Sequence, residues 1–322
     1  MENGESKIRK ADNLASFHSP LFTILFSLFI FLFSCSTAPD RPEEILTERT
    51  MVARQLDLAN QTANRGRFND ALLILDDARR FAISVDDPPL LIRTAISRGN
   101  ILFALGRHEE AFFEWEAALE EAESSGNPSL ASLARVYNAR GRLILLAGSS
   151  ADAAASGNQM AEAMEIRDQI RSFITTLEPN TRDQAAGNLI LGMAEKELGN
   201  YAEAERTARL SLDYHVKNLF LEEAAYDWFF IASVYSVSNR FDDALAALNN
   251  SISYDRRAEN GYGLDSSWQA VGEVYLRKDP YGEASRQDAV RAFQRSRDIF
   301  SSLGLLDLAA RAEARAVAAA GS

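Results

Sequence analysis

From about residue 46 to the C-terminus, apolar residues recur with helical spacing, and β-branched runs with a period of two are absent. Aligning the chain on itself gives a recurring core. It consists of a small residue, seven residues, a turn, an aromatic residue, two or three polar residues and an alanine. The copies span residues 59–71, 99–111, 141–153, 192–204, 232–244 and 272–289. This pattern predicts helix pairs repeated about six times.

The alanines that close each copy set the repeat length. They are Ala71, Ala111, Ala153, Ala204, Ala244 and Ala289, with spacings of 40, 42, 51, 40 and 45 residues. The longest spacing contains Pro179 and Asn180, which predict a loop, and we expect a subdomain seam near 167–182. The last copy carries an insertion at its turn, residues 278–282. Residues 305–320 are rich in alanine and predict a single capping helix.

The recurring core resembles the tetratricopeptide repeat (TPR). An aromatic residue early in the first helix matches Tyr137, Trp228 and Trp268, and the small residue of the second helix matches Ala78, Ala118, Ser251 and Ser296. The common TPR period is 34 residues, so the copies here are longer. The resemblance implies an all-α, right-handed α-solenoid of about six TPR-like helix hairpins with a C-terminal capping helix, over residues 46–322.

The N-terminal segment predicts export. Residues 21–33 form an apolar run of thirteen, shorter than the roughly 20 residues of a membrane-spanning helix and typical of a signal-peptide core. Leu32, Ser34 and Cys35 resemble the lipobox of bacterial lipoproteins, although Phe33 is bulkier than is usual there. The alternative is a signal peptide with an incidental cysteine.

The lipobox resemblance implies a lipid anchor. Residues 1–34 would be the signal peptide, and 35–45 a lipidated cysteine, Cys35, with a flexible tether. Two or more acyl chains give stable membrane anchoring. Ser36 implies the outer membrane, facing the periplasm, in a bacterial cell envelope.

Composition and motifs argue against catalysis. The net charge of -12 makes nucleic acid an unfavourable partner, and three histidines with one cysteine disfavour a Cys/His zinc site. HExxH, P-loop and CxxC motifs are absent from the sequence. Gly261, Gly263 and Ser266 half-resemble a dinucleotide motif, but no strand precedes them and we expect a loop. We therefore expect no enzyme activity, no cofactor and no metal.

A partner-binding groove is expected where TPR proteins line their concave face. The positions carried over are Asn60, Asn64, Arg93, Asn100, Arg135, Asn138, Arg142, Tyr226 and Phe229. The N-terminal half of this set is rich in asparagine and arginine, which suits an acidic peptide, because arginine presents a fixed fork of donors. The C-terminal half is aromatic and suits an interface anchor. The same residues could instead pack within the repeat.

The sequence thus predicts a membrane-anchored periplasmic TPR scaffold lipoprotein that holds one or more protein partners. The alternative function is a solute-transport accessory protein that binds a small hydrophobic or anionic ligand in a solenoid cavity. The identity of the partner and the presence of a homo-oligomer are left open by the sequence.

Overall fold

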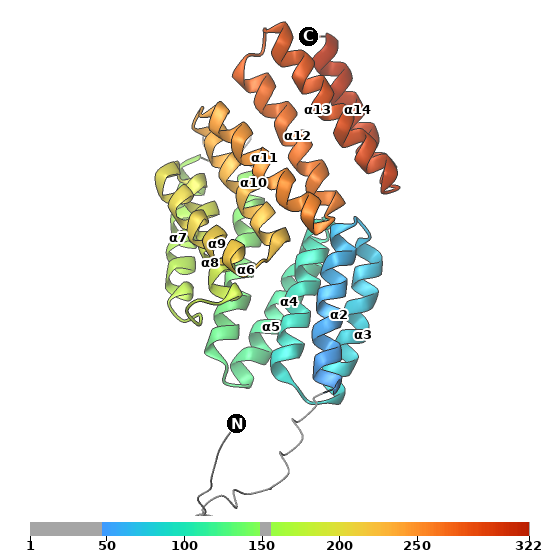
Figure 1. The fold of residues 1–322 in the computed structure, drawn as a ribbon. Helices are drawn as coiled ribbons and strands as arrows, with labels where there is room; N and C mark the ends of the chain where they lie inside the picture. The colour runs from blue at the N-terminus through green and yellow to red at the C-terminus, as the bar shows by residue number, and fades with distance from the viewer. Residues whose placement is uncertain (1–46, 149–155, 322) are drawn as a thin grey trace, which may run out of the picture. The chain divides into compact units, whose positions relative to one another are not determined.

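The computed structural model describes residues 47–148 and 156–321, and residues 46–322 form one compact unit. The described residues contain thirteen α-helices and no strand (Figure 1). The predicted signal peptide and tether, 1–45, lie outside the described residues, as does Ala153. No helix in the described ranges combines the length and the apolar character needed to cross a membrane.

Six helix hairpins follow one another along the chain, and a thirteenth helix closes the row. This confirms the predicted all-α solenoid, including its terminal capping helix and the turn at the 278–282 insertion. The helices are α2 (Thr47–Asn64), α3 (Phe68–Ser84), α4 (Pro88–Ala104), α5 (His108–Ser124), α6 (Pro128–Gly148), α7 (Ser156–Ile174), α8 (Arg182–Glu197), α9 (Tyr201–Lys217), α10 (Leu221–Val237), α11 (Phe241–Ala258), α12 (Gly261–Lys278), α13 (Glu283–Ser302) and α14 (Leu306–Gly321).

Local sequence explains where several helices begin. The side chains of Asp87, Thr181 and Asn260 accept hydrogen bonds from backbone N–H groups in the first turns of α4, α8 and α12. Such caps satisfy donors that have no partner within the helix. The Asn260 cap also corrects one expectation. Residues 261–266 form the first turns of α12 and are not a loop.

Most connections between helices are three residues long and contain one residue with positive φ. Five of these residues are glycines with φ between 66° and 77°, and five are not, among them Leu219 with φ 60°. Positive φ costs little for glycine but about 1–2 kcal/mol for a residue with a Cβ atom. The fold therefore imposes a left-handed turn even where the sequence supplies no glycine.

Close helix contacts occur at the small residues of the repeat. A Cβ atom on Gly99 of α4 would lie 2.4 Å from the indole Nε1 of Trp115, and one on Gly141 of α6 would lie 2.6 Å from Cζ3 of the same side chain. Trp115 of α5 is therefore held between two glycines and is 1% exposed. Gly272 and Phe293 repeat this contact between α12 and α13.

The core is built from alanines and medium-sized aliphatic residues along the row. The largest buried cluster extends from Val136 of α6 to Ala292 of α13. It contains Ile166 and Ile170 of α7 together with Leu189 of α8. Buried contacts therefore continue from α6 through α7 to α8, and the subdomain seam near 167–182 stays a prediction.

The first and sixth hairpins touch. Helix α12 contacts α2, and the rings of Phe68 and Tyr262 meet edge to face with centroids 5.4 Å apart. In Figure 1 the start of α12 lies at the end of α2 that leads into α3. The row of hairpins thus curves far enough for its beginning to meet its sixth member.

The contact at Gly99 can be tested by substitution. We expect Gly99→Ala to lower the free energy of unfolding by about 1–3 kcal/mol, because the new methyl group overlaps Trp115. Thermal unfolding followed by circular dichroism would measure this. Gly157→Ala is the control, because a Cβ atom there meets nothing within 4 Å. Equal melting temperatures for the two variants would contradict the close contact.

The left-handed turns predict a substitution that raises the free energy of unfolding. Leu219 is 71% exposed, so Leu219→Gly removes the cost of positive φ with little loss of buried surface. We expect the variant to be more stable by about 0.5–1 kcal/mol. Gly199→Ala, at a turn with φ 77° and open space around it, should be destabilised. Urea unfolding of both variants measures whether each change raises or lowers the free energy of unfolding. A Leu219→Gly variant less stable than wild type would contradict a cost of positive φ at this position.

Candidate functional site

The three predicted groove arginines are each held by a carboxylate of another helix. Arg93 of α4 donates to both oxygens of Asp183 on α8, at 3.1 and 2.7 Å, and this hydrogen bonding raises its pKa. Arg135 of α6 pairs with Glu123 of α5, and its guanidinium lies 5.7 Å from the Phe173 ring centroid.

Arg142, the third arginine, faces a different helix. Its guanidinium lies 3.5 Å from Glu162 Oε1 and 3.4 Å from Gln169 Oε1, both on α7. The structure therefore places Arg135 and Arg142 beside the helices that pair with α6, and Arg93 against α8. The three do not converge on one common partner.

The four predicted asparagines also differ in their surroundings. Asn64 donates to Glu222 of α10. The side-chain oxygen of Asn100 is buried and accepts no hydrogen bond from the described residues. Asn60 and Asn138 are half-buried. Of the four, Asn64 thus links distant parts of the chain.

The predicted aromatic anchor is a stacked pair on α10. Tyr226 and Phe229 have ring centroids 6.4 Å apart and an interplanar angle of 15°. Tyr226 is 42% exposed, whereas Phe229 is half-buried against the main core cluster. Trp228 lies between them in sequence, and its buried indole N–H has no acceptor among the described residues. Tyr226 is the member of this pair that a partner could reach.

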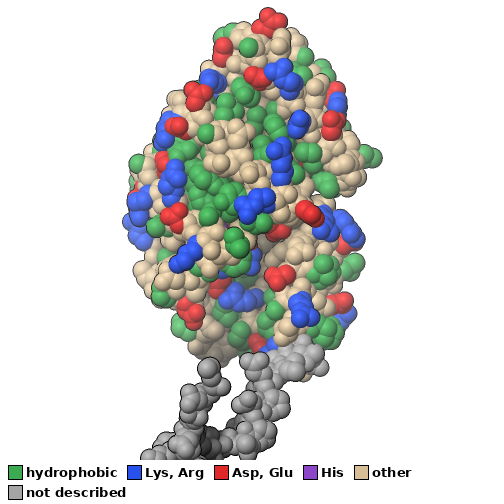
Figure 2. Space-filling view, viewed as in Figure 1, with side chains coloured by type: hydrophobic (Ala, Val, Ile, Leu, Met, Phe, Trp, Pro, Cys, Tyr) green, Lys and Arg blue, Asp and Glu red, His purple; other side chains and the backbone are tan. Residues whose placement is uncertain are grey.

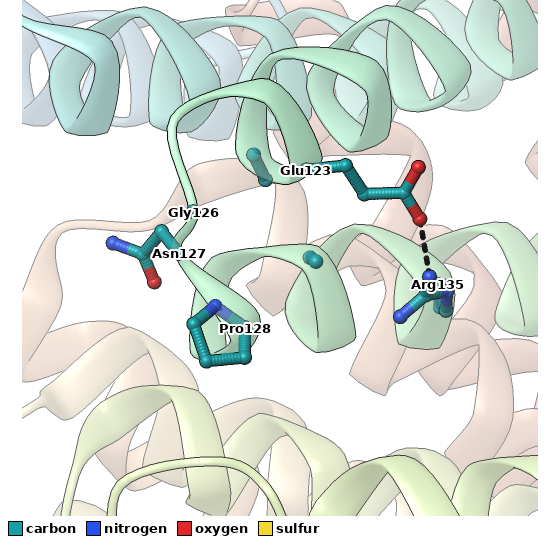
Figure 3. A pocket seen from close by; sticks show the side chains of 7 residues that line it. Glu123, Gly126, Asn127, Pro128 and Arg135 are labelled. Atoms are coloured by element: carbon teal, nitrogen blue, oxygen red, sulfur yellow. Dashed lines mark hydrogen bonds and ion pairs between the residues drawn. The ribbon is translucent and has the colours of Figure 1, made fainter.

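A pocket of about 360 Å³ lies at the turn between α5 and α6. Figure 3 shows Glu123 and Arg135 on one side of it, joined by their ion pair, with Asn127 and Pro128 at the turn. The side chains of Glu123 and Arg135 are 55% and 36% exposed. Both charges are therefore accessible, and Arg135 is the predicted groove residue that lines this pocket.

Exposed charges of both signs are mixed on the surface. On the face drawn in Figure 2, basic and acidic side chains alternate with hydrophobic ones, with no large area of one sign. Many of the ion pairs join residues three or four apart on one helix, such as Arg206 with Glu203. Exposed pairs of this kind contribute little to stability.

Sequence reasoning missed a set of polar contacts between distant helices. Arg182 of α8 pairs with Glu223 of α10, and its guanidinium also lies 4.8 Å from the Phe220 ring centroid. The neighbouring Glu222 accepts from Asn64. Adjacent carboxylates at the start of a helix give no sequence signal that identifies such partners.

A second missed feature is a buried network between α9 and α10. His215 Nδ1 lies 2.7 Å from Asp227 Oδ2, and Ser211 Oγ donates to Asp227 Oδ1 at 3.0 Å. Burial raises the pKa of Asp227, while the hydrogen bond from His215 acts against this. In hydrolytic triads the nucleophile bonds to histidine Nε2. Here Nε2 of His215 is buried without a partner in the described structure, and Ser211 Oγ lies 3.4 Å from Nδ1 of the same ring.

Two further buried carboxyl groups lie near the start of α12. Burial raises the pKa of Asp255 to about 7 and that of Asp265 to about 6. Asp255 accepts from Asn260, and Asp265 accepts from Ser296 and Gln269. Within the described part of the chain, no group of three or more histidine, cysteine or acidic residues is arranged to hold a metal ion.

Comparison with known proteins finds similarity at the level of the fold. No protein-family model matches the chain, and no curated protein matches it. A solved Rap protein complexed with Competence and Sporulation Factor is 14% identical, with a TM-score of 0.50 over 86% of this chain and 76% of that one. BtubC from P. vanneervenii is 15% identical, with a TM-score of 0.48 over 79% and 92% of the two chains. The TPR2AB domain of yeast Sti1 in its pHSP90 complex is 16% identical, with a TM-score of 0.32 over 84% and 99%. At 14% identity and a TM-score of 0.50, the similarity to the Rap protein concerns the fold alone.

Proposed function

We propose that this chain is a non-catalytic scaffold that binds one or more proteins along its row of hairpins. The observation that carries the proposal is the fold itself: six helix hairpins that present accessible side chains, among them Arg135 and Tyr226, on an extended curved surface. The structurally similar Rap protein was solved in complex with Competence and Sporulation Factor. A complex formed by a similar fold supports a binding role here.

The Arg135 pocket is the part of the predicted groove best suited to an acidic segment. A partner carboxylate would replace Glu123 as the ligand of Arg135, and an exposed ion pair of this kind is worth only about 0–1 kcal/mol. Replacing Glu123 by a partner carboxylate at Arg135 therefore costs little free energy. At Arg93 it is costlier, because Asp183 is only 17% exposed and binds with both oxygens.

The scaffold acts at a membrane in this proposal. Cys35 would carry acyl chains and hold the hairpins in the bacterial cell envelope, at the outer membrane facing the periplasm. Residues 1–46 lie outside the described structure, so the support for this anchor is the sequence alone: Cys35, its neighbours and the apolar run before them.

The alternative, a solute-transport accessory, has weaker support. The pocket at the α5–α6 turn is open, and its lining combines an ion pair with backbone and small side chains. A site for a hydrophobic solute is expected to be mostly apolar and to bury most of the ligand. A protein partner fits the accessible charges and the exposed Tyr226 better.

The anchor is tested by Cys35→Ser. In cells fed a labelled fatty acid, we expect the wild-type chain to be labelled and to sediment with membranes, because two or more acyl chains hold a protein stably at a bilayer. The variant should lose the label and appear in the soluble fraction. Ser34→Ala keeps a small residue before the cysteine and should behave as wild type. A labelled Cys35→Ser variant would exclude this residue as the anchor.

The binding surface is tested by reversing charge at Arg135 and Arg142 together. We expect the double variant Arg135→Glu, Arg142→Glu to capture less of the wild-type partners from an envelope extract after crosslinking, because an acidic segment would then be repelled. The control is Arg206→Glu with Arg291→Glu, which makes the same charge change at two exposed same-helix ion pairs. Circular dichroism checks that helix content is equal. Equal capture by both double variants would remove this surface from consideration.

A further inference from the structure

One half-buried arginine, Arg140 of α6, has no carboxylate to pair with. Eight arginines in the described ranges are half-buried, and six of them form an ion pair with a carboxylate: Arg79, Arg98, Arg135, Arg142, Arg167 and Arg297. Arg140 and Arg286 are the other two, and the described residues offer neither side chain a hydrogen bond or an ion pair. A cation that is partly withdrawn from water without an opposite charge is unfavourable.

Arg140 is one of three arginines near the hydroxyl group of Tyr137. It lies three positions after Tyr137, so the two side chains share one face of α6. Burial raises the pKa of Tyr137, and the positive charges of Arg140, of Arg182 on α8 and of Arg93 on α4 act against this rise. Tyr137 also packs against three core clusters, which include residues of α4 and α8 and hold its ring in place.

The other two arginines near Tyr137 already have carboxylate partners. Arg93 donates to both oxygens of Asp183, and Arg182 forms an ion pair with Glu223. Asp183 also acts on the Tyr137 hydroxyl, but its two oxygens are occupied by Arg93. Helix α6 contacts α4 and α8, and among the described residues neither helix supplies a carboxylate to the third arginine. The position therefore suits a negatively charged group from another molecule.

A second unsatisfied polar group occupies the equivalent position on the neighbouring first helix. Asp87 and Asn127 accept hydrogen bonds from backbone N–H groups at the starts of α4 and α6. Asn100 and Arg140 each lie thirteen positions after these capping residues, and α4 contacts α6. The side-chain oxygen of Asn100 is buried and accepts no hydrogen bond within the described part of the chain. A polypeptide offers both missing partners, because it carries carboxylate oxygens and N–H donors.

We propose that Arg140 binds a carboxylate group of a ligand, and that an acidic polypeptide segment supplies it. The guanidinium presents two parallel N–H donors to the two carboxylate oxygens, and a backbone N–H of the same segment would satisfy the Asn100 oxygen. Arg135, which lines the α5–α6 pocket, lies five positions earlier and about 140° around the helix, so the two arginines face different directions. This contact deepens the proposed scaffold function but can be tested apart from it, because a probe of defined chemistry replaces the natural partner.

Nuclear magnetic resonance of the arginine side chains observes this contact directly. In the full-length chain with isotope-labelled arginine, the Nε–Hε signal of Arg140 is identified by its absence in Arg140→Gln. The probes are tetraglutamate with blocked termini and succinate, each compared with sodium chloride at equal ionic strength so that screening stays constant. We expect tetraglutamate to shift the Arg140 signal to a plateau, and the signals of the paired Arg93 and Arg182 to change less.

The two probes distinguish the source of the carboxylate. Succinate carries carboxylates but no N–H group, so it leaves the Asn100 oxygen unsatisfied, and we expect it to bind more weakly than tetraglutamate. Equal affinities for the two probes would support the carboxylate contact at Arg140 and identify a small carboxylate, in place of a polypeptide, as its ligand.

A matched pair of substitutions separates this contact from general attraction by positive charge. Arg140→Gln should lower the affinity for tetraglutamate by about tenfold or more, because hydrogen bonds to a charged group are lost. Arg286→Gln removes the other half-buried arginine without an ion pair, makes the same change in net charge, and should bind tetraglutamate as the wild type does. Arg140→Lys should recover part of the affinity, because it keeps the charge without the two parallel donors. Isothermal titration calorimetry measures these affinities.

Three outcomes would overturn the proposal. The first is an Arg140 signal that reaches no plateau with either probe in the wild-type chain. The second is an unchanged affinity for tetraglutamate in Arg140→Gln. The third is an equal loss of affinity in Arg140→Gln and Arg286→Gln. Circular dichroism checks that the helices are intact. If Arg140→Gln loses helix content, Arg140→Lys identifies the signal and the wild-type titration remains the test.

Discussion

The close approach of helices at small residues is the constraint on which the architecture depends. Gly99 and Gly141 leave room on two successive first helices, and one indole, that of Trp115, fills both spaces. A methyl group at either glycine would meet the ring at less than 3 Å. Ridges can pack into grooves at short distance only where side chains are this small. The aromatic residue and the two glycines therefore act as one unit, which sets the distance between neighbouring hairpins.

Much of the fold could be predicted from the sequence, because the repeat pattern reflects packing between neighbouring helices. The small residues, the turns and the closing alanines recur in order, so the six hairpins, the insertion at 278–282 and the last helix follow from spacing. The expected loop at 261–266 was wrong for a physical reason. A half-match to a dinucleotide motif with no preceding strand suggested a loop, but the Asn260 side chain accepts from the backbone N–H of Gly263 and a helix begins at Gly261.

The surroundings of the candidate site were less predictable, because repeat position does not specify contacts between distant helices. Arg93 and Arg135 both lie six residues before their small residue, yet one binds Asp183 on α8 and the other Glu123 on α5. The partner of Arg93 lies 90 positions away. No spacing rule relates such residues. The same limit applies to His215 and Asp227, whose buried contact depends on how α9 packs against α10.

Exposure to water distinguishes the Arg135–Glu123 ion pair from the carboxyl group of Glu222. Arg135 and Glu123 are accessible, so their attraction is screened by water and their exchange for a partner's carboxylate costs little. Glu222 is half-buried where the first hairpin meets α10, and burial raises its pKa. Curvature brings the first hairpin against the fifth and sixth, and Asn64 of the first hairpin then donates to the half-buried Glu222 of the fifth. Contacts between distant hairpins thus give residues surroundings that their position within their own repeat does not specify.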